Sequence, residues 1–373
     1  MRRGAAFIFT IPTATIGSSS NIRPTIRRSA TTMTGETLQT GASIDQLIAT
    51  HHRRYAREYG GGLSDHGPMV LQAMRGLDLP EAAVREFAEF YLAKLDPIEP
   101  PTTRIDAGNY AEFVGKRDQY PALLEFFLDE VRRDGRTETV NRYLPGLLSA
   151  WASAAFHPLI RLGYGLEFGV DGEVAAGLAY AACLGPHSGL ERRATQCATR
   201  NPVEPMSALL DLQLPPDFET QNGWFHVRYS HALGHAVFDQ VHPPAGGLPA
   251  VAAACREVFA ASHNFFASHL VTGSHALRVC LEHLHETPPE IDAMAICAVV
   301  AAYLAVGAPE FSATAARDHD APAFEPSAFL ARTRDEHDIK LAYSCAAQAR
   351  AYDDPDYLAA ARGYLTTKAA KTV

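Results

Sequence analysis

The chain has 373 residues, and its composition of 47% hydrophobic and 20% charged residues is typical of a globular protein rather than a disordered or fibrous one. Residues 1–35 hold five Arg and no acidic residue, so the remainder carries 28 basic against 42 acidic side chains, a net charge of −14. Such an acidic body repels a phosphate backbone, and we expect no nucleic-acid binding.

Residues 1–40 are predicted to be a disordered or non-native N-terminal extension, and residues 41–373 one folded domain. The first 35 residues have the composition of a transit peptide, but Met33 also offers a plausible start. Six cysteines occur without a Cys-x-x-Cys pair, which indicates buried free thiols in a reducing compartment. No apolar run reaches the roughly 20 residues of a membrane-spanning helix. We therefore expect a cytoplasmic protein without a membrane segment.

From residue 43 onward the hydrophobic pattern is helical almost throughout, and alternating strand patterns are nearly absent. The predicted helices cover 65–77, 81–95, 123–131, 137–153, 171–183, 224–239, 248–259, 265–283, 291–306, 336–351 and 355–365. We expect the helix over 137–153 to break or kink at Pro145. The predicted fold is all-α, a single large helical domain of roughly ten to twelve helices.

The chain contains 16 histidines, although most proteins use histidine as an ordinary polar residue. His51 and His52 adjoin two arginines and are predicted to lie on a solvated helix face. His231 and His235, four residues apart, would share a helix face and form a reserve pair of metal ligands, although a glycine between them weakens that helix.

Three further histidines lie in passages where a solvated side chain would be out of place. His66 opens a predicted helix, His157 lies within the apolar stretch 154–165, and His269 lies within the apolar stretch 265–273. Taken alone, each is better interpreted as a hydrogen-bonded core histidine than as a ligand. Because neutral imidazole is the commonest metal ligand, three such residues in one all-α chain favour a metal site.

Lysine is scarce, with five residues against 28 arginines. Lys340 is the one lysine between residues 116 and 368, and it follows His337 by three residues, which places both on one helix face. Its ordinary role would be a surface residue with a partly buried stem. Unlike Arg, a buried Lys can lose its proton, act as a base or nucleophile, or add carbon dioxide to become a metal-binding carbamate. Lys368 is expected to lie in a frayed C-terminus.

Several strings of this sequence resemble the questin oxidase-like family. They are Asp65–Met69, Phe156–Gly165, His269–Thr272 with Ala276–Arg278, and His337–Lys340. The resemblance implies an all-α catalytic domain that oxidatively opens rings of aromatic polyketides, as a Baeyer–Villiger-type monooxygenase or a ring-cleaving dioxygenase. In at least one branch of the family, it implies a non-haem iron held by four His and a carboxylated Lys.

Carried over to this sequence, the resemblance assigns five ligands to Fe(II): His66, His157, His269, His337 and a CO2-derived carbamate on Lys340. His275 is the second choice to His269. Arg161 is a departure, because we expect many relatives to have another His there. The implied partners are a small aromatic substrate and O2. No dinucleotide-binding motif is present, so any use of NADPH would be indirect.

An apolar pocket with aromatic walls would suit a flat phenolic substrate. The candidate wall residues are Trp151, Tyr164, Trp224 and Phe266. Arg161 or Arg278 could bind a phenolate or carboxylate, or could instead form a structural salt bridge. The candidate catalytic side chains are Lys340, Arg161 and Tyr164.

Two other functions stay open at this point. His337 and Asp338 form the dipeptide of an HD-type metal-dependent phosphohydrolase, which is also all-α, although the further His and Asp of such a site are not evident. Alternatively, a non-enzymatic helical protein could bind an aromatic or haem-like ligand, with His157 or His269 as axial ligand.

Overall fold

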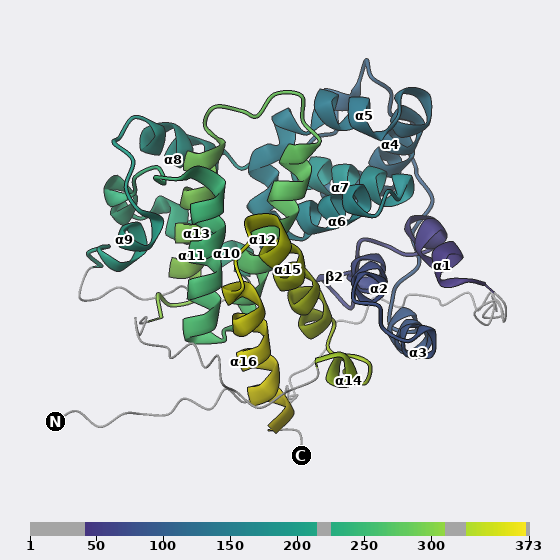
Figure 1. Ribbon diagram of the computed structural model, residues 1–373. Helices are drawn as coiled ribbons and strands as arrows, with labels where there is room; N and C mark the ends of the chain where they lie inside the picture. The colour runs from purple at the N-terminus through teal and green to yellow at the C-terminus, as the bar shows by residue number, and fades with distance from the viewer. Residues whose placement is uncertain (1–41, 215–224, 310–325, 371–373) are drawn as a thin grey trace, which may run out of the picture. The chain divides into compact units, whose positions relative to one another are not determined.

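The computed structural model describes residues 42–214, 225–309 and 326–370 (Figure 1). These described residues contain sixteen α-helices, five 3-10 helices and one two-stranded hairpin. The described residues form one compact and almost wholly helical unit, so the predicted all-α, single-domain fold is confirmed. There are more helices than predicted because several, such as α9 and α14, are too short to show a hydrophobic period. The predicted N-terminal extension lies outside the described residues.

The bounds of the elements are as follows. The α-helices are α1 Ile44–Thr50, α2 Gly67–Gly76, α3 Glu81–Leu92, α4 Tyr120–Asp134, α5 Arg136–Tyr143, α6 His157–Glu167, α7 Asp171–Leu184, α8 Ser188–Ala198, α9 Pro205–Leu210, α10 Phe225–Gly234, α11 Gly247–Ser262, α12 Phe265–Glu282, α13 Ile291–Ala305, α14 Pro326–Leu330, α15 Glu336–Tyr352 and α16 Asp356–Ala370. The 3-10 helices are η1 His51–Arg53, η2 Tyr110–Glu112, η3 Arg117–Gln119, η4 Pro145–Phe156 and η5 Ala236–Gln240. The antiparallel hairpin pairs β1 Glu58–Tyr59 with β2 Leu63–Ser64.

Each helix predicted from hydrophobic spacing has a counterpart, with ends shifted by a few residues. The predicted break at Pro145 is present, because α5 ends at Tyr143 and η4 begins at the proline. The helix predicted over 224–239 ends early, at Gly234, and His235 then takes an extended conformation that caps η5. Helix α6, which is buried from His157 to Leu166, is not among the predicted helices, because Gly163 and Gly165 lower its helix propensity.

Four helices form a closed ring within the fold. Helix α2 packs on α6, α6 on α12, α12 on α15, and α15 on α2 (Figure 1). Helix α6 also packs closely on α7. The candidate ligands predicted from the sequence all lie at or near the beginnings of the four ring helices, so this ring is the frame of the candidate site.

Small residues allow α6 to approach its neighbours at backbone distance. A Cβ added at Gly163 would lie 2.8 Å from the Cα of Ala276 in α12. A Cβ added at Gly177 of α7 would lie 2.6 Å from the Cα of Leu162 in α6. Contacts this short to a backbone atom require the helices to move apart, so the glycines fix the position of α6 in the ring.

The apolar run predicted to form a buried helix is α13, and its residues are almost all buried. Among the described residues, no helix is both long and apolar enough to cross a bilayer. All six cysteines are buried with free thiols, as predicted.

Gly177→Ala tests the close contact between α6 and α7. Because the new methyl group would meet the backbone of α6 rather than a flexible side chain, we expect the free energy of unfolding to fall by about 2 kcal/mol or more. Urea denaturation measures this change. The matched control is Gly363→Ala in α16, where no described atom lies within 4 Å of the added Cβ. There Ala should raise the stability by up to about 1 kcal/mol. Equal effects of the two substitutions would contradict the packing described.

Candidate metal centre

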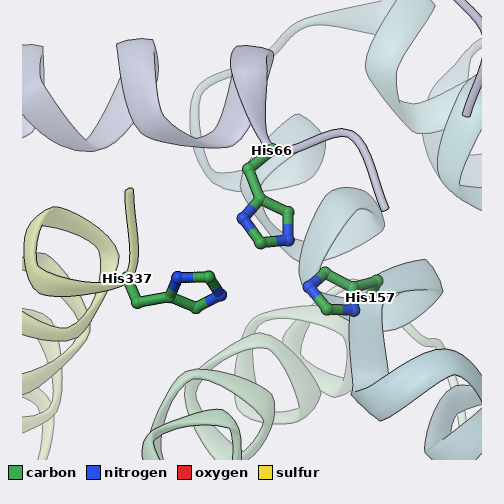
Figure 2. A group of neighbouring side chains, drawn as sticks. All are labelled: His66, His157 and His337. Carbon is green, nitrogen blue, oxygen red and sulfur yellow. The ribbon is translucent and has the colours of Figure 1, made fainter. Parts of the chain in front are cut away.

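Four imidazoles meet inside the ring of helices. The ring centroid of His66 lies 4.5 Å from that of His157, in a stacked arrangement, and 4.7 Å from that of His337. The fourth imidazole is that of His269, whose ring centroid lies 5.0 Å from that of His157 and 5.1 Å from that of His337. Figure 2 shows His66, His157 and His337 with their rings turned toward one another. Candidate ligand nitrogens of these three lie within 4.8 Å of one another, close enough to share one metal ion.

Each of the four histidines stands at or near the N-terminus of a different ring helix. His66 is the N-cap of α2, His157 is the first residue of α6 and His337 is the second residue of α15. His269 lies one turn into α12. Helix N-termini carry partial positive charge. A cation bound among them therefore needs an anionic ligand beside the neutral imidazoles.

Three of the rings are held by hydrogen bonds on their outer side. Nδ1 of His157 bonds the carbonyl oxygen of Ala154 at 2.5 Å, and Nδ1 of His269 bonds the carbonyl oxygen of Phe265 at 3.2 Å. Nδ1 of His337 lies 3.1 Å from a carboxylate oxygen of Asp335. An acceptor at Nδ1 places the proton there and leaves the Nε2 lone pair for a metal, the usual arrangement of histidine ligands. Nε2 of His157 is buried without a hydrogen-bond partner in the described part of the chain.

A strained turn carries the acceptor for His157. Ala154, Ala155 and Phe156 have φ angles of 47°, 52° and 67°, three successive left-handed residues without a glycine. Each costs about 1–2 kcal/mol in a non-glycine residue. The ring of Phe156 covers Gly273 of α12, where an added Cβ would lie 3.1 Å from a ring carbon. Packing on α12 therefore holds a turn that brings the Ala154 carbonyl to the imidazole.

Lys340 lies beside this cluster, on α15, and is 1% exposed. Its Nζ atom has no hydrogen-bond partner among the described residues. Burial lowers its pKa to about 8, against the opposing attraction of nearby carboxylates such as Glu336. A substantial fraction of the amine is therefore neutral near pH 8, which is the form that can act as a base or add carbon dioxide.

The buried imidazoles are held in their neutral form. Burial lowers the pKa of His66, His157 and His269 well below the ordinary value, and the nearby Lys340 charge lowers each further. The pKa of His337 is lowered by burial too, although its bond to Asp335 acts in the opposite direction. Neutral imidazole is the metal-binding form.

The prediction that His51 and His52 lie on a solvated face is wrong, because both are buried. Helix α1 ends at Thr50, and the tight η1 turn directs the two rings inward. Nε2 of His51 lies 2.5 Å from a carboxylate oxygen of Asp65, the residue before His66. His52 packs against Gly172, where an added Cβ would overlap its ring. His51 thus supports the loop that carries His66, whereas His52 packs on α7.

Of the candidate catalytic side chains, Arg161 and Tyr164 make contacts outside the imidazole cluster. The Arg161 guanidinium forms a buried ion pair with Glu173 at 2.7 Å and lies 3.8 Å from the carboxylate of Asp65. Of the two roles predicted for Arg161, it therefore has that of a structural salt bridge. The Tyr164 hydroxyl donates to the backbone carbonyl of Lys340 at 3.4 Å. Arg161 therefore lies near the residue before His66, and Tyr164 contacts the backbone of Lys340.

The structure distinguishes His269 from His275, the alternative candidate for the same metal-ligand position. His275 is buried but bonds Ser344 at 3.0 Å and Glu167 at 3.2 Å, whereas His269 contacts the other imidazoles. Arg278 pairs with Glu282 and lies nine residues from His269, about 13 Å along α12. It is therefore not part of the imidazole cluster.

Two further sets of residues were predicted from the sequence, the tryptophans of the pocket wall and the reserve histidine pair. Trp224 falls outside the described residues, as does the side chain of Trp151. The reserve pair does not share a helix face, because α10 ends at Gly234, between His231 and His235. His231 is exposed to solvent.

Three residues near the cluster escaped the sequence reasoning. Phe265 is 53% exposed, and its ring lies 4.5 Å from that of His337. Glu336 has a carboxylate oxygen 3.6 Å from Nδ1 of His66. Asp335 caps α15 and bonds His337. An acid two residues before a histidine at a helix start is a signal that could have indicated Asp335.

The HD-type arrangement is not formed. The carboxylate of Asp338 is fully buried and bonds Lys368 at 2.6 Å and Thr333 at 3.1 Å. In an HD site the Asp and the preceding His hold the metal together, but here the Asp338 oxygens are engaged by a lysine and a threonine. The contacts of Asp338 therefore count against a phosphohydrolase.

Comparison with known sequences identifies the family of this chain. The profile of the questin oxidase-like family matches residues 63–241 and 248–345. The chain belongs to this family. All five candidate ligands, His66, His157, His269, His337 and Lys340, lie within the matched ranges.

Two characterised relatives are similar over shorter stretches. A Baeyer-Villiger monooxygenase, dmxR6 of Cryptosporiopsis sp. (strain 8999), is 37% identical over 76 residues, which are 18% of this chain and 17% of the relative. The questin oxidase of Aspergillus fumigatus (strain ATCC MYA-4609 / CBS 101355 / FGSC A1100 / Af293) is 30% identical over 109 residues, 27% of this chain and 24% of the relative. The matched stretches thus span a quarter or less of these relatives.

The buried histidines should make the stability of the metal-free protein depend on pH. Unfolded histidines have a pKa near 6.5, whereas burial holds those of His66, His157 and His269 well below that value. Below about pH 6.5 the unfolded chain therefore binds more protons than the folded one, and the free energy of unfolding falls as the pH falls.

Urea denaturation of chelator-treated protein at pH 7, 6 and 5 measures this effect. Each shifted histidine contributes up to about 1.4 kcal/mol per pH unit, so His269→Gln should flatten the dependence by up to that amount. An identical slope in the wild type and in His269→Gln would contradict the burial of a neutral imidazole at this position.

Proposed function

We propose that this protein is an iron-dependent oxygenase that uses O2 to cleave or lactonise a ring of an aromatic polyketide-like substrate of the anthraquinone type. One observation carries the proposal. In a member of the questin oxidase-like family, four neutral imidazoles converge from four helices beside a lysine amine that has no hydrogen-bond partner among the described residues. The names of the two relatives, an oxidase and a monooxygenase, support an oxygenase activity.

The donor set fits non-haem Fe(II). Imidazole suits iron, and an anionic oxygen ligand completes the kind of set that iron oxygenases use. His66, His157, His269 and His337 would hold the ion through one nitrogen each. When bound, the iron would supply the redox chemistry that lets O2 react with the substrate. The protein contributes the geometry of the imidazoles and a site from which water is largely excluded.

Lys340 would provide the anionic ligand as a carbamate. Its neutral amine nitrogen attacks the carbon of CO2 and releases one proton to solvent, which leaves one negative charge on the two new oxygens. Two features support this step. Burial lowers the pKa of Lys340 to about 8, so the neutral amine is accessible. The converging helix N-termini also favour a negative charge at this place.

The substrate would approach across the aromatic surface formed by Phe265 and Phe266. Phe265 is half-exposed beside His337 and His269, and a large aromatic side chain left exposed next to a buried polar cluster suits contact with a flat ligand. Phe266 stacks on Phe225 with ring centroids 5.1 Å apart and continues the surface. A phenolate form of the substrate would be favoured by the same helix N-termini. Any use of NADPH would be indirect.

Metal analysis tests the proposal first. Protein reconstituted anaerobically with Fe(II) should hold one iron per chain and consume O2 with an anthraquinone-type substrate. Lys340→Ala removes the anionic ligand and should lower the iron affinity by about 10-fold or more, and added bicarbonate should not restore it. Iron content by mass spectrometry and oxygen uptake by electrode provide the two measurements.

Two controls make this result specific. Lys116→Ala removes a lysine whose ammonium lies over the ring of Phe113, and it should leave the iron content unchanged. Glu336→Gln neutralises the carboxylate that lies 3.6 Å from Nδ1 of His66 and should also retain iron. Full iron content in Lys340→Ala would exclude its role as a ligand. A wild type that binds no iron and takes up no O2 would exclude the proposed function.

Phe265→Ala tests the aromatic contact. Loss of the stacked ring should raise KM for the aromatic substrate by about 5- to 10-fold, equivalent to about 1 kcal/mol, with a smaller change in kcat. The matched control is Phe90→Ala, which removes another exposed phenylalanine, on α3. Steady-state kinetics of both variants decide the point, and equal KM values in Phe265→Ala and the wild type would rule out the contact.

A further inference from the structure

We propose that Lys368, on α16, is a positioning residue that fixes the imidazole of His337 through Asp335. This inference rests on the proposed function, in which His337 is a metal ligand. Lys368 does not touch the imidazole cluster in any contact described; its effect passes through a carboxylate. The expectation that Lys368 lies in a frayed terminus is wrong, because it belongs to α16 and makes two ion pairs.

The two oxygens of Asp335 have separate partners. Oδ1 accepts from the backbone N–H of His337 at 3.0 Å and lies 3.1 Å from its Nδ1. Oδ2 accepts from Nζ of Lys368 at 2.6 Å. A carboxylate held at both oxygens cannot rotate about its last bond without losing one partner. The ammonium therefore fixes the carboxylate, and the carboxylate fixes the tautomer and orientation of the imidazole.

A second contact anchors the ammonium itself. Nζ of Lys368 also donates to Oδ1 of Asp338 at 2.6 Å, and that carboxylate is fully buried. Asp335 and Asp338 both flank His337 on the first turn of α15, so the single ammonium separates two like charges. Without it, the two carboxylates would repel each other and Asp338 would lose its cationic partner. Buried carboxylates without a partner are costly, so the first turn of α15 would rearrange.

Metal binding by the metal-free protein provides the test, with Co(II) as the probe. Lys368→Met should raise the Kd for Co(II) by about 10- to 100-fold and alter the visible absorption bands of the bound ion, because the His337 ring is no longer fixed. Lys368→Arg keeps a cationic donor and should recover most of the affinity and the wild-type spectrum. Lys116→Met is the matched control and should bind as the wild type does. Thermal unfolding followed by circular dichroism confirms that the variants are folded.

A readout without metal separates this inference from the proposed function. In the metal-free protein with ¹⁵N-labelled histidine, the Nδ1–H signal of His337 should be protected from exchange in the wild type and in Lys368→Arg, and lost in Lys368→Met. Wild-type Kd, spectrum and Nδ1–H protection in Lys368→Met would overturn the role of Lys368. A wild type that binds no Co(II) and no Fe(II), yet shows the expected Nδ1–H pattern, would instead contradict the metal centre and leave Lys368 as an anchor of His337 alone.

Discussion

The rest of the site depends on one electrostatic constraint. The Lys340 amine is buried beside four imidazoles at the N-terminal ends of four helices, and no described residue forms a hydrogen bond with it. Burial and the positive ends of the helix dipoles disfavour a positive charge on this amine, against the opposing attraction of Glu336, Asp335 and Asp65. Burial accordingly lowers the pKa of Lys340 to about 8. The site is therefore suited to a metal cation that binds together with an anionic ligand. A carbamate on Lys340 would be that anionic ligand and would also remove the positive charge of the amine.

The surrounding fold supplies the rigidity that such a site needs. Glycine contacts hold α6 against α7 and α12, so the first residue of α6, His157, has little freedom. The left-handed turn at 154–156 adds a carbonyl acceptor for its ring. On the opposite side of the ring of helices, Asp335 and Lys368 restrain His337 in a similar way. Packing of Phe156 on α12 holds the strained turn, and the ion pair with Lys368 holds the charge of Asp335.

Most of the fold could be predicted from the sequence, because the spacing of hydrophobic residues identifies an amphipathic helix. Helix α6 could not, since Gly163 and Gly165 lower its helix propensity. The histidine cluster was accessible through apolar context and family resemblance, and Lys340 through the scarcity of lysine. The burial of His51 and His52 could not be predicted, because a short 3-10 turn directs the two side chains inward. Lys368 was missed because its partners lie 30 and 33 residues away and meet it only after α16 packs on α15.

A crystal structure of the iron-loaded protein, with an anomalous difference map collected at the iron absorption edge, tests the central claim most directly. The account predicts a single strong peak inside the ring of helices, bonded to one nitrogen each of His66, His157, His269 and His337, with a carbamate oxygen on Lys340 as the anionic ligand. A peak at another place, or an iron ion at this place with an unmodified Lys340 and a different anionic ligand, would contradict it.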